Sequence, residues 1–124
     1  MKVLCVERDK ARLRQMRKEA RELVPGAHIT VCRDPFKAEA MAKAKGCDVL
    51  LTDTFFDGRS LDGVMLAERI QRVNPRVNII FITDHADTSA AYDAWQIGAS
   101  AFLLRPYEKQ RLAKVLANPR FASE

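Results

Sequence analysis

Charged and hydroxyl-bearing side chains follow short aliphatic runs at four places along this chain of 124 residues. They are Glu7, Arg8 and Asp9 after VLCV, Asp53 after VLLT, Thr83, Asp84 and His85 after NIIFI, and Arg105 after AFLL. A carboxylate can attack phosphorus when cations neutralise the incoming oxygens, and carboxylate oxygens are also ligands that Mg²⁺ prefers. Either chemistry requires a fold that brings these residues together.

The spacing of the apolar residues predicts such a fold. Short continuous aliphatic runs alternate with longer segments of helical period, which is typical of βαβ units. The predicted strands are 3–6, 28–32, 48–52, 77–82 and 101–104, and the predicted helices are 10–24, 34–46, 62–73, 88–97 and 108–117, the last of which ends before Pro119. Right-handed crossovers then give a parallel sheet with helices on both faces, whose ligand crevice lies beyond the carboxyl ends of the strands.

Length and composition indicate one globular domain, 1–124, with no output domain. The chain is 48% hydrophobic and 30% charged, its net charge is +5, and no run approaches the ~18 apolar residues of a membrane span. We therefore expect no membrane and no nucleic-acid partner, and, because MKVLCVERD is not a secretory signal, a cytoplasmic location. Cys5, Cys32 and Cys47 form no CxxC pair, which favours buried thiols over a disulfide framework or a zinc site.

Several matches together resemble the response-regulator receiver domains of two-component signalling, the CheY-like family. They are an acid after the first strand, Asp53 after the third, Thr83 after the fourth, the segment SLDGVML, and GASAFLLRPY around the fifth strand. The intervals of 30 residues from Asp53 to Thr83 and of 22 from Thr83 to Arg105 are similar to those of receivers. The resemblance covers the whole chain and implies a flavodoxin-like (βα)5 doubly wound parallel sheet of order 2-1-3-4-5.

The resemblance also implies roles for particular residues. Asp53 stands where receivers accept a phosphoryl group from a histidine kinase or a phosphotransfer protein, and Thr83 stands where they contact that group. Phe102 holds the place of the aromatic residue that changes packing on activation, and Arg105 holds the place of the family's phosphate-contacting lysine. Such a protein is not an enzyme beyond transferring a phosphoryl group to itself and removing it, and it signals through contacts with a downstream protein.

The metal site that the resemblance implies is altered in this chain. Its oxygen ligands for Mg²⁺ would be Glu7, Asp53 and the backbone carbonyl of Phe55, with Asp9 as a poorer substitute, but Arg8 replaces the second acid that most receivers carry after the first strand. An arginine has no lone pair for a metal, and its charge opposes a nearby dication. Glu7 and Asp53 against Arg8 and Arg105 sum to zero charge without a metal, so we expect any phosphorylation to depend weakly on Mg²⁺ at best.

Two surface features could mark partner sites, each with a simpler structural explanation. Tyr92 and Trp95 lie three residues apart on the fourth predicted helix, and in receivers this helix, the fifth strand and the fifth helix form a partner or homodimer surface; ordinary amphipathic packing explains the pair as well. The first predicted helix carries a basic stripe, which in receivers would help to dock the phosphodonor but is also what a solvated helix face looks like. The stripe comprises Lys10, Arg14, Arg17 and Arg21.

Other functions fit the sequence less well. A flavin-binding protein of this sheet order needs a phosphate cradle of small residues where the chain has ERDKAR, and a haloacid-dehalogenase-type phosphohydrolase needs Asp-x-Asp where Asp53 is followed by Thr54 and Phe55. One alternative to the phosphorylated receiver stays open. In it, Arg8 and Arg105 hold Asp53 in a permanent salt-bridged cluster, and the protein is a pseudo-receiver adaptor independent of phosphorylation and of Mg²⁺.

Overall fold

The computed structural model describes residues 1–56, 61–85 and 87–117. Within them, five strands alternate with five helices: β1 (Lys2–Val6), α1 (Lys10–Leu23), β2 (His28–Cys32), α2 (Pro35–Lys45), β3 (Val49–Thr52), α3 (Gly63–Val73), β4 (Asn78–Thr83), α4 (Thr88–Gln96), β5 (Ala101–Leu104) and α5 (Lys109–Leu116). Every predicted element is present, and no end differs from its predicted position by more than one residue. Ser60 of the SLDGVML segment and Pro119 lie outside the described residues.

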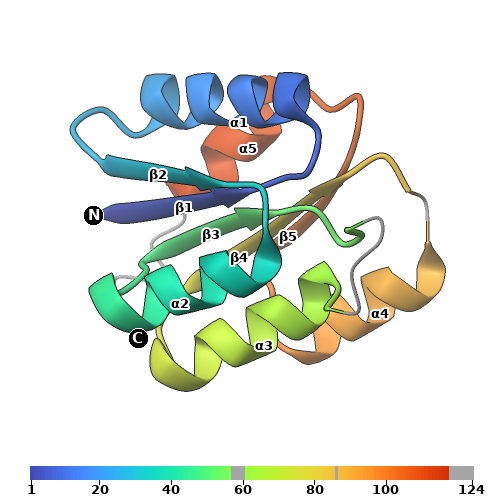
Figure 1. The fold of residues 1–124 in the computed structure, drawn as a ribbon. Coiled ribbons are helices and arrows are strands. Elements are labelled where there is room, and N and C mark those ends of the chain that lie inside the picture. Colours follow the sequence, from blue (N-terminus) through green and yellow to red (C-terminus); the bar gives the residue numbers. More distant parts are fainter. Residues whose placement is uncertain (57–60, 86, 118–124) are drawn as a thin grey trace.

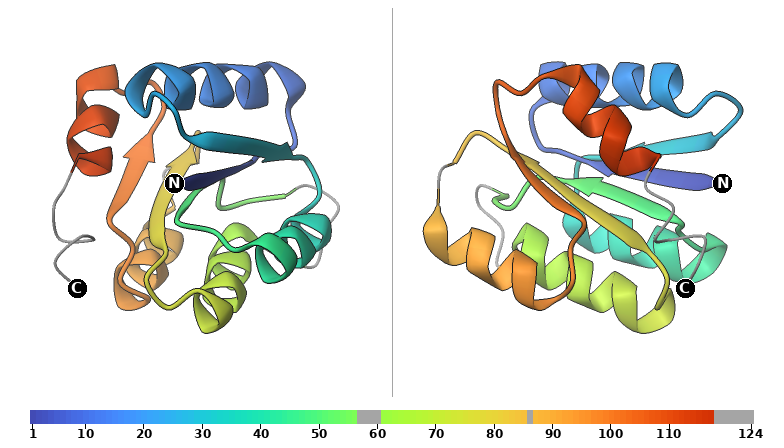
Figure 2. Two further views of the ribbon diagram at one scale, coloured as in Figure 1. Left: turned by 90° about the vertical axis from the view of Figure 1, so that its left-hand side faces the viewer. Right: turned by 180° about the vertical axis from the view of Figure 1, so that it is seen from behind.

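The strands form one parallel sheet in the order β2-β1-β3-β4-β5, as predicted. Helices α1 and α5 cover one face of the sheet, and α2, α3 and α4 cover the other (Figure 1). The two further views show the same three layers from the side and from behind (Figure 2). Strand order reverses beside β1, so the carboxyl ends of β1 and β3 form the switch point at which such sheets place a ligand.

Four helices begin at an aspartate that caps them. The Asp9, Asp34, Asp62 and Asp87 side chains each accept a backbone N–H from the first turn of the following helix. These caps satisfy donors that the helix itself leaves unpaired. They also fix where each helix starts relative to the strand end before it, which is where the charged residues lie.

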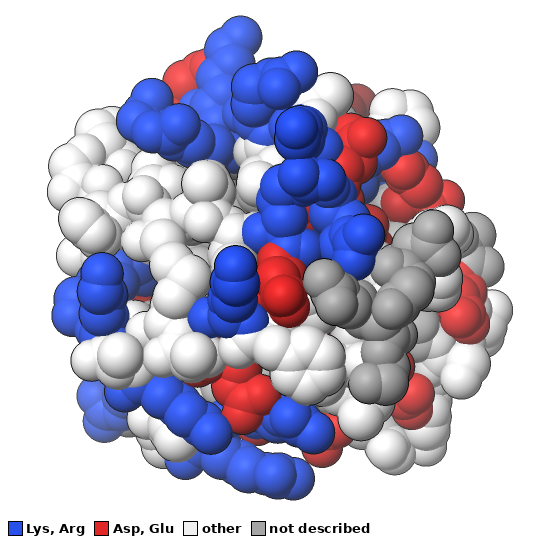
Figure 3. Space-filling view, in the orientation of Figure 1, with Lys and Arg blue, Asp and Glu red and all other residues white. Residues whose placement is uncertain are grey.

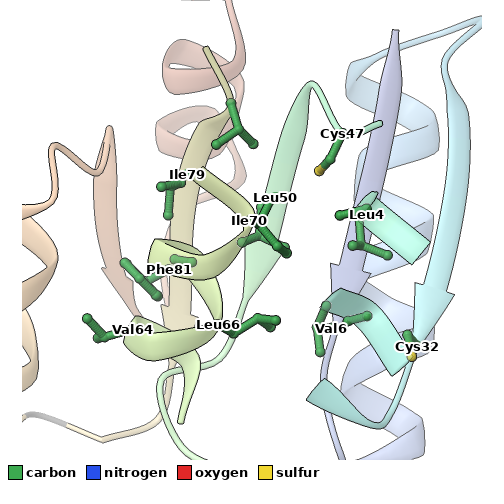
Figure 4. Packing of buried hydrophobic residues seen from close by; sticks show 14 of the residues in the cluster. Leu4, Val6, Cys32, Cys47, Leu50, Val64, Leu66, Ile70, Ile79 and Phe81 are labelled. Atoms are coloured by element: carbon green, nitrogen blue, oxygen red, sulfur yellow. The ribbon is translucent and has the colours of Figure 1, made fainter. Parts of the chain in front are cut away.

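Each face of the sheet has its own hydrophobic core. On the side of α2, α3 and α4, Ile70 and Leu66 of α3 pack toward Leu50, Ile79 and Phe81 of the strands (Figure 4). On the other face, α1 and α5 pack against a second cluster that includes Cys5, Met16, Leu51, Ile82 and Leu112. Continuous aliphatic strands are expected when both faces of a parallel sheet are covered.

The three cysteines, Cys5, Cys32 and Cys47, are all buried and unbridged, as predicted. Burial raises the pKa of the Cys5 thiol and that of the Cys47 thiol to about 12 each. In the described part of the chain, no helix is long and apolar enough to cross a membrane.

Candidate functional site

The carboxyl edge of the sheet brings together the side chains that follow β1, β3, β4 and β5. Glu7 and Asp53 come from adjacent strands, since β1 pairs with β3, and Thr83 ends β4 between β3 and β5. Arg105 follows β5, and its backbone N–H donates to the Thr83 carbonyl at 2.8 Å. Glu7, Asp53 and Thr83 are buried, whereas Arg105 is partly exposed.

Asp53 is held in place by the backbone that follows it. Its Oδ1 accepts the backbone N–H of Thr54 at 2.6 Å and that of Phe55 at 3.2 Å. No hydrogen bond to a described backbone amide engages its second oxygen, Oδ2. The carboxylate is therefore fixed through one oxygen and leaves the other free of the backbone.

Gly63 brings the start of α3 against the strand that carries Asp53. Its backbone N–H donates to the Thr54 carbonyl at 2.8 Å, and a Cβ at this position would lie 1.8 Å from the Asp53 carbonyl oxygen. Only glycine tolerates so close a backbone approach. This role was not predicted from the sequence, in which its one signal is a glycine directly after the capping Asp62.

Thr83 is hydrogen-bonded on two sides. Its Oγ1 accepts the backbone N–H of His85 at 3.1 Å, and the Thr54 hydroxyl lies 3.3 Å from it. The hydroxyl thus caps the turn after β4 and links that turn to the residue next to Asp53. His85 is exposed, and its ring contacts that of Phe55 edge-on at 5.6 Å between centroids.

Glu7 is a buried acid beside a second acid. Burial raises its pKa above the ordinary value, and the neighbouring Asp53 carboxylate raises it further. The backbone N–H of Asp9, which donates to Glu7 Oε2 at 2.9 Å, and the charge of Arg105 oppose these effects. Two adjacent carboxylates in a poorly solvated site favour protonation of one of them.

Arg105 pairs with different carboxylates from those expected. Its Nη1 lies 3.4 Å from Glu7 Oε1 and 3.9 Å from Asp84 Oδ1. No ion pair joins Arg105 to Asp53 among the described residues, so they do not show the salt-bridged cluster that the pseudo-receiver alternative places around Asp53. The reason is the position of the two carboxylates. The buried Glu7 carboxylate and that of Asp84, which follows β4 beside β5, both lie within 4 Å of the Arg105 guanidinium.

Arg8 is the second arginine that the pseudo-receiver alternative places beside Asp53. The residue is half-buried, yet within the described range it forms no ion pair with Asp53 or Glu7. Its backbone carbonyl accepts the Arg33 Nε–H at 2.8 Å, which ties the end of β1 to the residue after β2. Figure 3 shows Lys and Arg side chains gathered over α1 and continuing toward the middle of this face.

The residues present do not fit a resident Mg²⁺. Arg8 occupies a position where an acid is needed, Arg105 is paired with Glu7, and the raised pKa of Glu7 opposes the ionised form that a metal binds. No group of three His, Cys, Asp or Glu side chains in the described segments is arranged to hold a metal. Asp9 is committed to capping α1, where its Oδ2 accepts the Arg12 N–H at 2.9 Å.

Phe102 lies away from the charges, half-buried on β5. Its ring is 6.2 Å from that of Phe81, centroid to centroid, and packs against the core under α3 and α4. Tyr92 and Trp95 contact one another at 6.2 Å and are largely exposed. Packing into the core therefore does not explain the aromatic pair on α4.

One connection was not anticipated from the sequence. The Arg12 guanidinium on α1 lies 2.7 Å from Asp84 Oδ2, so Asp84 joins α1 to Arg105. Asp84 was included among the strand-end charges, but nothing in the spacing marked Arg12 apart from the other arginines of α1. The pairing depends on how the first turn of α1 lies against the loop after β4.

Comparison with known proteins identifies the family that these features represent. Residues 3–117 match the profile of the family described as "Response regulator receiver domain". The DNA-binding transcriptional regulator NtrC of Escherichia coli is 39% identical over 70 residues, which cover 56% of this chain and 14% of that protein. The curated relatives are several times longer than this chain, which aligns with between 13 and 22% of their lengths.

Solved structures share the fold at low identity. The signal receiver domain of an HD domain-containing protein from Pseudomonas fluorescens superposes with a TM-score of 0.84 at 21% identity, covering 99% of this chain and 98% of that one. A CheY-like receiver domain protein from Methanospirillum hungatei gives a TM-score of 0.83 at 17% identity, covering 98% and 94%. These likenesses concern the arrangement of the elements alone.

Proposed function

The chain belongs to the family of response regulator receiver domains, and from this premise we propose that Asp53 is its phosphoacceptor. A receiver domain is a component of two-component signalling rather than a catalytic enzyme, and receivers partner with histidine kinases. The donor proposed for Asp53 is accordingly a histidine kinase or a phosphotransfer protein.

The observation that carries this proposal is the setting of the Asp53 carboxylate. It follows the strand at the switch point and is 6% exposed, and among the described residues two backbone amides fix Oδ1 while none binds Oδ2. An oriented, partly desolvated carboxylate of this kind can act as a nucleophile. Thr83 and Arg105 reach the same edge from the neighbouring strands.

The proposed reaction is a single displacement at phosphorus. An Asp53 oxygen forms a bond to phosphorus as the bond from phosphorus to the donor's imidazole nitrogen breaks, and that nitrogen keeps the electron pair. The three phosphoryl oxygens then need positive charge and hydrogen-bond donors. Arg105 offers guanidinium donors that can bind two oxygens at once, and the Thr83 hydroxyl is a further donor.

Receivers typically bind Mg²⁺, whereas this pocket has Arg8 in the place of one metal-ligating acid and Arg105 in the place of the family's lysine. We therefore propose that phosphorylation of this chain depends little on Mg²⁺, because Arg8 replaces a metal-ligating acid and Arg105 supplies a fixed cation beside Glu7. The stabilisation of the phosphoryl group then comes from fixed cations rather than from an ion in exchange with solvent.

The experiment is phosphorylation of the purified protein with acetyl phosphate, with and without Mg²⁺, followed by intact mass. We expect a gain of one phosphoryl group that is similar in both conditions and is lost in Asp53→Asn. Asp48→Asn is the matched control, because Asp48 is an exposed aspartate at the opposite end of β3 that binds the Lys2 backbone N–H at 2.7 Å. Beryllofluoride, read out by amide chemical shifts, tests the same site without covalent chemistry.

A second function is favoured by one specific observation, the ion pair between Arg105 and Glu7. A pocket whose charges already satisfy one another suits a pseudo-receiver adaptor, whose state is set by its partners rather than by phosphorylation. The same experiment separates the two: a chain that gains no phosphoryl mass and gives no beryllofluoride shifts in either condition supports the adaptor.

We further propose that the signal leaves through protein contacts on the face of α4, β5 and α5, either to a downstream protein or to a second copy. Tyr92, Trp95 and Leu104 are exposed apolar side chains there. A shift of the Asp53 loop would reach this face through Thr83 at the end of β4, the strand between β3 and β5, and through Phe102 on β5.

A further inference from the structure

Arg105 lies between two carboxylates without being bound fully to either. Its Nη1 is 3.4 Å from Glu7 Oε1 and 3.9 Å from Asp84 Oδ1, and both distances exceed those of a good charge-assisted hydrogen bond. Among the described residues, Nη1 and Glu7 Oε1 are buried and neither makes a hydrogen bond. A buried N–H group without an acceptor destabilises the folded state, so the Arg105 guanidinium can gain free energy by binding a closer acceptor.

Asp84 is the member of this group that faces outward. Its side chain is 36% exposed, and its other oxygen, Oδ2, is 2.7 Å from the Arg12 guanidinium. Asp84 therefore sits between two arginines, one in the pocket and one on the surface of α1. Because the two arginines share one carboxylate, a stronger ion pair with one of them weakens the ion pair with the other.

We infer that Arg12 and Asp84 are positioning residues for Arg105. They set how readily its guanidinium binds Glu7 and a phosphoryl group on Asp53, an inference that rests on the proposed function. Arg12 neutralises Asp84 and so leaves Arg105 available to Glu7 and to an anion on Asp53. An acidic side chain of a docked partner that captured Arg12 would release Asp84 to draw Arg105 away. The linked ion pairs of Arg12, Asp84, Arg105 and Glu7, here called the ion chain, thus connect the surface of α1 to the pocket.

The inference predicts opposite effects for two variants that break the same surface ion pair. In Arg12→Gln, Arg105 is the one arginine that the described part of the structure still places beside Asp84, so its guanidinium is held more tightly there. In Asp84→Asn, Arg105 loses one carboxylate and is held less tightly. The double variant should match Asp84→Asn, because Arg12 acts only through Asp84.

The first measurement is the exchange of the Arg105 guanidinium protons with water, observed by NMR on protein carrying ¹⁵N-labelled arginine. Loss of one signal in Arg105→Lys assigns it. We expect exchange to be slowed about twofold in Arg12→Gln and accelerated about twofold in Asp84→Asn, the scale of a partly exposed ion pair. Arg14→Gln and Asp93→Asn are matched controls, since they make the same charge changes on exposed residues of α1 and α4.

A second measurement follows binding of beryllofluoride at Asp53. We expect apparent affinity to fall about twofold in Arg12→Gln and to rise by a similar factor in Asp84→Asn. If the wild-type protein binds no beryllofluoride, the proposed phosphoacceptor function fails, while the proton-exchange experiment still decides the ion chain. Equal or same-direction effects of the two variants, or a double variant that resembles Arg12→Gln, would overturn the inference.

Discussion

The residue that most distinguishes this pocket is Arg8, which follows Glu7 at the end of β1. The residue is half-buried, and in the described part of the chain it forms no ion pair with Asp53. A cation there opposes a divalent ion through Coulomb repulsion and supplies no ligand atom. In the proposed function, this one side chain therefore favours fixed cations over a metal ion as the charges that stabilise a phosphoryl group.

Replacing that charge should restore a metal site. We expect Arg8→Asp to create Mg²⁺ affinity, because it adds a carboxylate ligand beside Glu7 and Asp53 and removes the opposing cation. Calorimetric titration with MgCl₂ measures this, with Arg14→Asp as the control that makes the same charge change on the exposed face of α1. Absence of binding in Arg8→Asp would contradict our account of the pocket.

Glu7 makes the stability of the protein depend on pH in a defined direction. Because its pKa is raised in the folded state, the stability it contributes is fully present below its unfolded pKa and is lost as pH rises through the folded pKa. Glu7→Gln removes this dependence. In urea unfolding between pH 4 and pH 8, the wild-type protein should lose stability relative to the variant as pH rises, and parallel curves would contradict the prediction.

At the scale of elements, the start of α3 depends on its contact with β3. The Gly63 backbone lies so close to the Asp53 carbonyl that no side chain fits between them. We expect Gly63→Ala to lower the free energy of unfolding by at least about 2 kcal/mol, since backbone must move. Gly26→Ala is the comparison: its φ of +84° costs strain, but nothing lies within 4 Å, so about 1 kcal/mol is expected from denaturant curves.

The elements themselves could be predicted because their signals are local. Aliphatic runs, capping aspartates and terminal glycines fix strands and helices within a few residues, and crossover handedness then fixes the sheet. Asp53 and Thr83 follow as candidates from their place at strand ends. The partners of Arg105 could not be predicted, because the choice among Glu7, Asp53 and Asp84 depends on side-chain geometry across four separate loops.

At the scale of the whole molecule, two cores enclose the sheet, and buried thiols lie in both of them. Thiols are nucleophilic only as thiolates, and the pKa values of about 12 for Cys5 and Cys47 leave almost none at neutral pH. We expect iodoacetamide to leave both unmodified in the native protein, as read by peptide mass, and to modify all three cysteines in urea. Rapid native labelling of either would mean that its core opens far more often than the packing indicates.

Trp95 is the chain's single tryptophan, and with 73% of its surface exposed on α4 it has a practical use. Its fluorescence arises from one known position, next to Tyr92 and on the face proposed to carry the signal onward. A blue shift of the emission on mixing with another protein, or a change in quenching by iodide after acetyl phosphate, would register events at that face without any attached dye.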